Sequence, residues 1–292
     1  MRINYNVATK VVVYSIACAM SLFLGACGAT TSGNETISEA AEQEMPRFEI
    51  TDEDERTSFD DDAVKVDLSQ VSGDFEIKEG GDYVLSGSGD CRIVVDAKEK
   101  PVHLFLDGIE LIENEGGAVL ALSASKLIIT CLDGTENVLG DSAYYQENKE
   151  YDACLYSVPD LTINGSGSLR ITGLYEDGIH SKDIVKILGT TLEVKAKGDG
   201  IRGNDGICFT SASGCKVEAE KNGLRTSKNG HDVKGSVEIR DSVVSVIAGK
   251  YAIESYDGLV VSGSSLYLNG VLGKWQVAGE EFVEEGNVNG DR

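Results

Sequence analysis

Two short stretches of the chain place pairs of aspartates at the same spacing. Asp177 and Asp183 lie in "YEDGIHSKD", and Asp199 and Asp205 follow 22 residues later in "KGDGIRGND". If the stretches lie one above the other, each facing pair of like charges costs about 3 kcal/mol at about 5 Å and an effective dielectric constant of about 20. Ca²⁺ accepts carboxylate and carbonyl oxygens in irregular turns and would neutralise these corners. The spacing therefore predicts calcium bound by Asp177, Asp183, Asp199 and Asp205.

The same spacing has a structural interpretation, because Asp-Gly is favourable in turns whose carboxylates point into water. The following repeat carries Asn222 and Asn229 at the equivalent positions, so complete calcium sites are expected only in the first two repeats. Asp152 and Asp160 could extend the calcium sites one repeat towards the N-terminus. Calcium is the favoured interpretation, since two aspartates recur together.

Basic residues form a second row, each one position after a recurring apolar residue. His180, Arg202 and Arg225 occupy this row, and Glu254 follows them. One role for the row is internal, in ion pairs with the aspartates. The other role is external, because a basic row beside calcium would hold the carboxylates of an acidic polysaccharide such as polygalacturonate. The sequence leaves both roles open, and they are compatible.

Two further sets of residues could act on a sugar ligand. Tyr144 and Tyr145, in the loop "DSAYYQENKEYDACLY", could present ring faces to sugars or could pack the loop onto the domain. In a pectate lyase, a metal acidifies the proton next to a uronate carboxylate and a base removes it. Lys182 or Lys228 would be that base, but both occur in Ser-Lys turns and no spacing distinguishes them.

Short strands would position these residues. Four segments each begin with an alternating apolar pair, namely Leu169/Ile171, Leu192/Val194, Val217/Ala219 and Val244/Val246. A single apolar residue follows each pair, and three segments close with another alternating pair. No window has helical periodicity, and 34 Gly against 3 Pro favour corners that keep their N–H groups. Three short strands per 22 residues predict an all-β fold, a parallel β-helix solenoid.

The N-terminal part of the chain predicts export and anchoring. Residues 1–27 resemble a signal peptide that ends in "LGAC", a lipobox-like sequence that would make Cys27 the lipidated first residue of the mature protein. An ordinary signal peptide cleaved nearby is the alternative. Residues 28–62 are acidic and poor in apolar residues, which predicts a disordered tether, and residues 63–292 would form the β-helix domain. The expected location is the outer face of the bacterial cell membrane, in contact with the extracellular space.

Charge and cysteine usage exclude other classes of protein. The formal net charge is −23, and no basic cluster could neutralise phosphates, so nucleic acid is not an expected partner. Five cysteines lie outside the export segment, without CxxC or zinc-ligand spacing. We expect several of these cysteines to be small core residues, and a Cys208–Cys215 disulfide is the less favoured alternative.

The motifs also resemble a known family. The run "DLTINGSGSL", "DGIHSKD" and "DGIRGND" is similar to carbohydrate-binding domains of clostridia and related bacteria, over about residues 60–270. Membership would imply a right-handed parallel β-helix with bound calcium, exported to the cell surface and similar in architecture to calcium-dependent pectate lyases. It would also imply binding to polygalacturonate and cellulose-like glucans. Carried over by position, the implied calcium ligands are Asp177, Asp183, Asp199 and Asp205. Pro159 stands where the family pattern has an acid.

Three functions are consistent with these residues. The favoured one is a lipid-anchored, carbohydrate-binding surface protein that holds acidic plant cell-wall polysaccharide, polygalacturonate or pectin, with calcium and the basic row. Cellulose would be a further ligand. The second is a calcium-dependent pectate lyase, and the third is a non-catalytic spacer or adhesin. A repeating aspartate is better explained by the repeat than by a unique catalytic pair, so an enzyme is the less favoured alternative.

Overall fold

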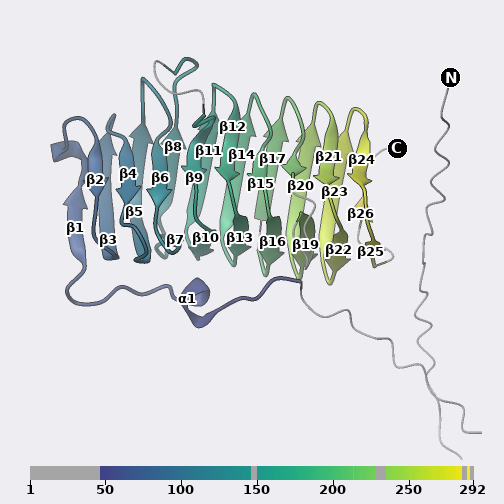
Figure 1. Ribbon diagram of the computed structural model, residues 1–292, viewed down its shortest axis with the longest axis horizontal. Helices are drawn as coiled ribbons and strands as arrows, with labels where there is room; N and C mark the ends of the chain where they lie inside the picture. Colours follow the sequence, from purple (N-terminus) through teal and green to yellow (C-terminus); the bar gives the residue numbers. More distant parts are fainter. Residues whose placement is uncertain (1–46, 146–149, 213, 228–234, 285–287, 290–292) are drawn as a thin grey trace, which may run out of the picture.

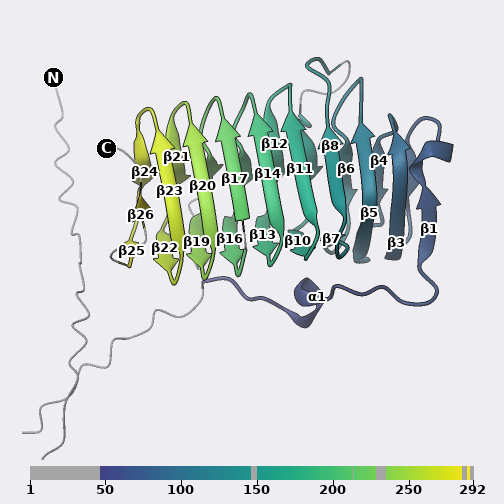
Figure 2. The same ribbon diagram turned by 180° about the vertical axis from the view of Figure 1, so that it is seen from behind.

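The computed structural model describes the chain in five stretches. These are residues 47–145, 150–212, 214–227, 235–284 and 288–289. Figures 1 and 2 show strands stacked side by side along one long axis, from the N-terminal β1 to the C-terminal β24, β25 and β26. Cys27 and Lys228 lie outside the described residues.

All of the described strands belong to two parallel sheets. Sheet A has 17 strands. They are β1 (Val64–Asp67), β3 (Gly81–Gly89), β5 (Val102–Ile112), β7 (Leu127–Cys131), β8 (Glu136–Gly140), β10 (Leu161–Gly165), β11 (Ser168–Gly173), β13 (Ile184–Leu188), β14 (Thr191–Ala196), β16 (Gly206–Thr210), β17 (Gly214–Ala219), β19 (Ser236–Arg240), β20 (Val243–Ala248), β22 (Leu259–Ser262), β23 (Ser265–Gly270), β25 (Glu281–Val283) and β26 (Val288–Asn289).

Sheet B has nine strands, and its pairings, like those of sheet A, are parallel. They are β2 (Phe75–Ile77), β4 (Ile93–Asp96), β6 (Val119–Ser123), β9 (Ala153–Ser157), β12 (Asp177–Ser181), β15 (Ile201–Gly203), β18 (Leu224–Arg225), β21 (Tyr251–Ser255) and β24 (Gly273–Val277).

Helices are nearly absent from the described residues. They are the α-helix α1 (Asp52–Glu55) and the 3₁₀ helix η1 (Leu68–Gln70). Neither of them, in the part of the chain that the structure describes, has the length and apolarity needed to cross a bilayer. The prediction of an all-β chain with parallel strands is therefore confirmed.

The strand pairing follows the sequence repeat. From β10 onwards, two strands of sheet A alternate in chain order with one strand of sheet B. Val185 lies opposite Ile207, and Val237 lies opposite Leu259, each 22 residues later in the chain. Because side chains alternate between the two faces of a strand, this register places equivalent residues of successive repeats next to each other on one face.

Apolar pairs form continuous buried rows between the sheets. Three of the four predicted pairs are correct, but the third is Cys215/Val217 and not Val217/Ala219, because Cys215 lies opposite Leu192 and Ala219 is only half-buried. Leu169, Leu192, Cys215, Val244 and Leu266 lie in register, and each is at most 3% exposed. Burying a Leu or Val side chain contributes about 1.5–3 kcal/mol, so the rows supply much of the cohesion between repeats. The five cysteines of the described residues are all buried and free. Cys91, Cys131, Cys154 and Cys215 lie in the core between the sheets, as predicted, whereas Cys208 lies opposite Lys186 on the outer face of sheet A.

Residues 47–59, here called the strap, lie against sheet A, which differs from the prediction of a disordered tether over 28–62. Phe48 is buried, Asp54 in α1 is fully buried, and Phe59 packs edge-on against Phe105 at 5.3 Å between ring centroids. Figure 1 shows the strap running along the stack beside β7, β10, β13, β16 and β19. The prediction is wrong for this part because a few specific contacts, which composition does not reveal, order it.

Candidate functional site on the outer face of sheet B

The aspartate row forms a hydrogen-bonded ladder along one edge of sheet B. Oδ1 of Asp177 accepts the backbone N–H of Asp199 at 2.7 Å. Oδ1 of Asp199 accepts the N–H of Asn222 at 2.9 Å, and Oδ1 of Asn222 accepts the N–H of Tyr251 at 3.3 Å. Each side chain therefore satisfies a backbone donor of the next repeat. The aspartate row therefore has a structural role. The structural interpretation of the sequence placed these side chains in water, but Asp177, Asp199 and Asn222 are buried.

The glycines after the aspartates allow the repeats to approach closely. A Cβ atom on Gly178 would lie 2.8 Å from the carbonyl oxygen of Gly200, and one on Gly200 would lie 2.7 Å from the carbonyl oxygen of Gly223. These contacts with backbone atoms are too short for any side chain. The recurring Asp-Gly pair is thus explained by the ladder and by the close approach of one repeat to the next.

The basic row lies on the outer face of sheet B. His180 is in register with Arg202, Arg202 with Arg225, and Arg225 with Glu254. The same row continues towards the N-terminus, where Tyr156 lies opposite His180. One face of the sheet therefore presents an aromatic residue, three basic residues and an acid in succession.

Each basic side chain pairs with an acid from the repeat before its own. The pairs are His180 Nδ1 with Asp152 Oδ1 at 2.5 Å, Arg202 Nη1 with Asp177 Oδ2 at 3.8 Å, and Arg225 Nη1 with Asp199 Oδ2 at 3.0 Å. The internal ion-pair role of the row is thus present. The side chains of Arg202 and Arg225 remain 23% and 36% exposed, so both also face solvent, whereas His180 is buried.

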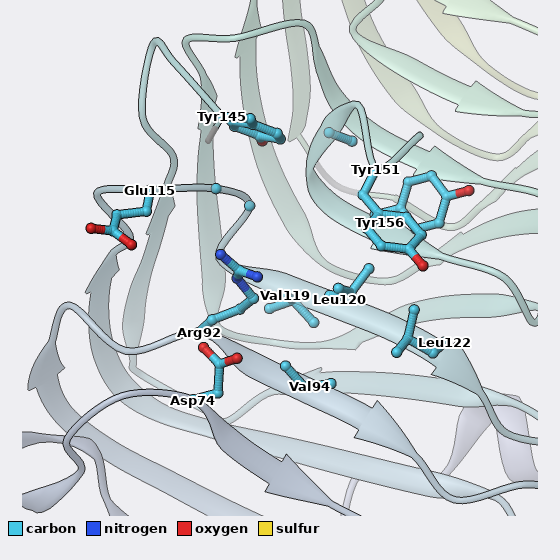
Figure 3. Close-up of a pocket in the computed structure, with 13 residues that line it drawn as sticks. Asp74, Arg92, Val94, Glu115, Val119, Leu120, Leu122, Tyr145, Tyr151 and Tyr156 are labelled. Atoms are coloured by element: carbon cyan, nitrogen blue, oxygen red, sulfur yellow. The ribbon is translucent and has the colours of Figure 1, made fainter. Parts of the chain in front are cut away.

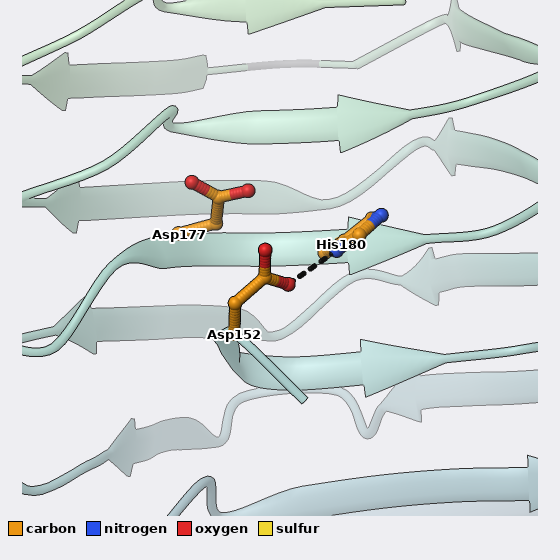
Figure 4. Close-up of side chains that lie close together, drawn as sticks. All are labelled: Asp152, Asp177 and His180. Carbon is orange, nitrogen blue, oxygen red and sulfur yellow. Dashed lines mark hydrogen bonds and ion pairs between the residues drawn. The ribbon is translucent and has the colours of Figure 1, made fainter. Parts of the chain in front are cut away.

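Asp152, Asp177 and His180 meet where the acidic and basic rows join (Figure 4). One ligand atom from each lies within 4.8 Å of the others, so this group could hold a metal ion. Oδ2 of Asp177 has no hydrogen-bond donor among the described residues. Burial, with repulsion from Asp199 and Asp152, raises the pKa of Asp177 to about 8. A cation at this junction would favour the ionised carboxylate, and Arg202 supplies part of that charge.

The four aspartates predicted as calcium ligands do not form one site. Asp177 and Asp199 precede or begin β12 and β15, whereas Asp183 and Asp205 follow the other ends of these strands. The five-residue strand β12 separates the two corners by about 13 Å. Both oxygens of Asp199 already bind donors of the next repeat. Of the four, only Asp177 belongs to the group of potential metal ligands found among the described residues.

Lys182 is poorly suited to act as a general base. Its Nζ lies 2.7 Å from Glu150 Oε1 and 5.9 Å from the centre of the Tyr156 ring. The hydrogen bond with Glu150 is the main reason that the pKa of Lys182 is raised. A base in β-elimination needs a lowered pKa, so that it is neutral when it accepts the proton. The other predicted base, Lys228, lies outside the described residues.

A cleft of about 210 Å³ adjoins the N-terminal end of the basic row. Its lining includes Asp74, Arg92, Val94, Glu115, Val119, Leu120, Leu122, Tyr145, Tyr151 and Tyr156. Figure 3 shows the polar side chains Asp74, Arg92 and Glu115 on one side, and the rings of Tyr151 and Tyr156 on the other. An apolar floor with a few polar groups at its rim is the usual composition of a small-molecule site.

The two tyrosines predicted to bind sugar differ in exposure. Tyr144 is 70% exposed and free to present its ring. Tyr145 is 6% exposed, stacks on Tyr175 at 4.1 Å, and donates its hydroxyl hydrogen to Asp141 Oδ2 at 2.6 Å. Its ring is therefore part of the packing of the loop, and it meets the cleft only as one lining residue.

Comparison with known proteins agrees with this arrangement. A model of the carbohydrate-binding domain-containing proteins matches residues 72–284, more than half of the chain. The chain belongs to this family. A carbohydrate-binding domain-containing protein of Acetivibrio thermocellus is 36% identical over 149 residues, which are 47% of this chain and 52% of the relative. The carbohydrate-binding domain thus matches about half of the length of that relative.

A solved structure resembles the carbohydrate-binding domain over most of its length. It is described as the structure of the polysaccharide lyase-like protein from C. thermocellum, in a gadolinium derivative. The TM-score is 0.73 at 27% sequence identity, and the match covers 79% of this chain and 99% of the solved one.

Sequence reasoning missed the apolar floor of the cleft in this carbohydrate-binding domain. Leu120 and Leu122 alternate along β6 with the inward-facing Val119 and Ala121, so the strand is apolar on both faces. A strand that is apolar on both faces is covered on both faces, or binds something on one of them. In the sequence, the run Val119 to Leu122 is apolar at every position, and this break in alternation could have indicated a second apolar face.

Proposed function

We propose that the outer face of sheet B binds acidic polysaccharide, with polygalacturonate or pectin as the preferred ligand and cellulose as a further one. The observation that carries this proposal is the register Leu120–Tyr156–His180–Arg202–Arg225, which joins the cleft to the basic row on one face. Neighbouring strands are about 4.8 Å apart, close to the length that one pyranose residue adds to an extended chain. A polysaccharide lying along the stack would therefore meet an equivalent position with each sugar.

The two parts of the face would bind different features of the ligand. The apolar floor and Tyr151 would contact the faces of sugar rings, while Asp74, Arg92 and Glu115 bind hydroxyl groups at the rim. The solvent-facing sides of Arg202 and Arg225 would bind uronate carboxylates. Their existing partners hold the guanidinium groups in place, so the ligand does not have to order them.

Calcium is part of the proposal, with Asp152 and Asp177 as the ligands. Oδ2 of Asp177, which accepts no hydrogen bond from the described residues, and the raised pKa of this carboxyl group support it. The solved polysaccharide lyase-like neighbour was obtained as a gadolinium derivative, and gadolinium, like calcium, is a hard cation that prefers oxygen ligands. When bound, calcium would neutralise the buried carboxylates and offer a coordination position to a uronate oxygen. Asp152 and Asp177 also hold and orient Arg202 of the basic row.

We further propose that the two sheets are the walls of a single right-handed parallel β-helix with three strands per coil of about 22 residues. The alternation of strands between the sheets and the 22-residue register support it.

Lipidation at Cys27 would anchor this domain to the outer face of the cell membrane. A Cys27→Ala variant should then appear in the medium, and its retention in the membrane fraction would contradict the anchor.

The binding proposal is tested by retention of the full chain on immobilised polygalacturonate. We expect the Arg202→Gln/Arg225→Gln variant to bind at least tenfold more weakly than the natural protein. Arg170→Gln is a matched control, because Arg170 is an exposed arginine on sheet A. Binding that is unchanged in the double variant, with an unchanged melting temperature, would overturn the proposal for this face. Retention that survives a calcium chelator would remove calcium from it.

Lyase activity is the second candidate, and the resemblance to a polysaccharide lyase-like structure is the observation that favours it. Unsaturated product, followed by ultraviolet absorbance in the same incubation, measures it directly. Because the pKa of Lys182 is raised, we expect no product at neutral pH from this lysine. Product formation that is lost in Lys182→Gln would reverse the assignment in favour of the lyase.

A further inference from the structure

The strap lies on sheet A in the direction that an extended polymer would take. Near one end, the backbone N–H of Arg47 donates to Glu238 Oε2 on β19 at 2.6 Å. Near the other, the Arg56 guanidinium binds Asp82 on β3 through both carboxylate oxygens, at 2.6 and 2.7 Å. The strap therefore crosses strands of successive repeats and runs along the stack (Figure 2). Near its centre, the carboxylate of Asp54 forms hydrogen bonds with side chains of sheet A.

The carboxylate of Asp54 is bound by side chains from three neighbouring strands or turns of sheet A. Oδ1 accepts hydrogen bonds from Lys126 Nζ at 3.0 Å and from Thr162 Oγ1 at 2.6 Å. Oδ2 accepts one from Lys186 Nζ at 2.9 Å. Lys126 immediately precedes β7, Thr162 lies on β10 and Lys186 on β13, and these strands are neighbours in the sheet. Two ammonium groups and a hydroxyl group in this arrangement form a receptor for a carboxylate.

This receptor requires an anion. The side chains of Lys126 and Lys186 are only 13% and 7% exposed. With the strap in place these ammonium groups are largely shielded from water, and without a counter-charge that is strongly unfavourable. Any molecule that takes the place of the strap over them must therefore also supply an anion. In the natural protein Asp54 supplies that anion, and its neighbours in the short helix α1, Asp52, Glu53 and Glu55, are exposed.

Space for a longer ligand exists beside the strap. A cavity of about 580 Å³ is bounded by Ile50, Glu55 and Thr57 of the strap. On the other side it is bounded by the ends of sheet A strands and the turns after them, including Leu132, Asn164, Ser166, Leu188 and Thr210. The cavity thus follows successive repeats in the same direction as the strap.

We propose that the row Lys126–Thr162–Lys186 on sheet A is a second binding site for a carboxylate-bearing polysaccharide, which the strap occupies through Asp54. The site is distinct from the face of sheet B, and only the class of ligand is shared with the function proposed above. A tethered occupant acts at a high effective concentration, so free polymer competes poorly until the strap is released. The strap thereby limits the number of acidic chains that one molecule can hold.

The test uses the full chain with the sheet B face disabled by Arg202→Gln/Arg225→Gln. In that background, Asp54→Ala should create a saturable site for oligogalacturonate. Calorimetry should show binding at least tenfold tighter than in the same background with Asp54 intact. Adding Lys186→Gln should abolish this gain. Asp52→Ala is the matched control, because Asp52 is an exposed acid of the same short helix. A neutral oligosaccharide of equal length should show no gain.

Two calorimetric results would overturn the proposal. One is a folded Asp54→Ala protein that gains no oligogalacturonate binding, and the other is a gain that Lys186→Gln does not remove. If Asp54→Ala does not fold, Asp54→Asn keeps the shape of the side chain and is read in the same way. In the natural protein, saturating oligogalacturonate should speed amide hydrogen exchange in residues 50–56, and unchanged exchange would also contradict the site. Failure of the sheet B face leaves the calorimetric readings intact, because they are made with that face disabled.

Discussion

The outer faces of sheet B and sheet A both place cations against carboxylates, but they obtain the acid in different ways. On sheet B, Asp199 meets Arg225 of the following repeat, 26 residues away, and the arginine remains partly exposed. On sheet A, Asp54 meets Lys186 across 132 residues of chain, and both side chains are buried. The first arrangement follows from the sequence repeat. In the second, the strap, which lies outside the repeats, covers the outer face of sheet A.

The difference has energetic consequences. A partly exposed ion pair contributes about 1 kcal/mol or less, because water screens the charges. A buried pair contributes little net stability as a whole, but the removal of one partner leaves an uncompensated charge and costs several kcal/mol. We therefore expect substitutions on the strap to have larger effects on folding, and substitutions on the basic row to have larger effects on ligand binding.

The largest effect on stability is expected for Asp54→Ala. The variant leaves Lys126 and Lys186 without their carboxylate, so the free energy of unfolding should fall by about 3 kcal/mol at neutral pH. Although burial raises it, hydrogen bonds from Thr162, Lys186 and Lys126 hold the pKa of Asp54 well below its ordinary 3.8. The deficit should therefore be complete above pH 3.8 and should shrink as the pH falls below it.

Denaturant unfolding between pH 2 and pH 7 measures this deficit. Asp52→Ala, on the same helix but exposed, should change the free energy of unfolding by less than about 0.5 kcal/mol. An Asp54→Ala deficit no larger than that of Asp52→Ala would mean that the two faces do not differ as described.

A stabilising change is expected on sheet B from Asp177→Asn. The pKa of Asp177 is raised to about 8, so this carboxyl group stabilises the fold below pH 3.8 and loses that contribution as the pH rises through about 8. Asparagine keeps the acceptor for the Asp199 N–H without the charge, as Asn222 does in the next repeats. Above pH 8, with chelator present, we expect a gain of about 2 kcal/mol.

Thermal unfolding with and without calcium sharpens this prediction. Added calcium should stabilise the natural protein more than the Asp177→Asn variant, and so narrow the gap between them. If Asp177→Asn destabilises the protein in chelator, the negative charge is needed in the absence of metal. The ion pair with Arg202 would then outweigh the repulsion between the carboxylates.

A smaller loss is expected from Asn222→Ala in the ladder. Asn222 donates to Asp199 and Glu254 and accepts the N–H of Tyr251, so its removal leaves buried polar groups unpaired. We expect the free energy of unfolding to fall by about 1–2 kcal/mol. Limited proteolysis of the strap should be unaffected, and faster cleavage there would show that the two faces are coupled.

The smallest effect is expected from Arg170→Ala. Arg170 Nε lies 3.3 Å from Glu193 Oε2 on sheet A, and more than half of the arginine side chain is exposed. This pair comes from neighbouring repeats but lies outside the basic row, so we expect a change in unfolding free energy below about 0.5 kcal/mol. A loss above 1 kcal/mol, measured by denaturant unfolding, would mean that exposed pairs between repeats contribute more than the comparison assumes.

Much of the fold could be predicted from the sequence, and less of the site. The apolar pairs Leu169/Ile171 and Leu192/Val194 were placed correctly on inward faces, because period-two alternation and a fixed repeat together set the register. The basic row was also placed correctly. The partner of each arginine was not predicted, since that depends on how far the corner of one repeat is offset from the next.

The sequence by itself determined the parallel strands, the buried rows and the alignment of Asp177 with Asp199 and of Arg202 with Arg225, because each rests on a pattern that recurs within one repeat. Only the tertiary structure decided that the aspartates bind backbone donors of the next repeat, that a cleft adjoins the basic row, and that the strap covers sheet A. The physical reason lies in range: Asp54 and Lys186 meet across 132 residues, and a single long-range contact leaves no period in the sequence.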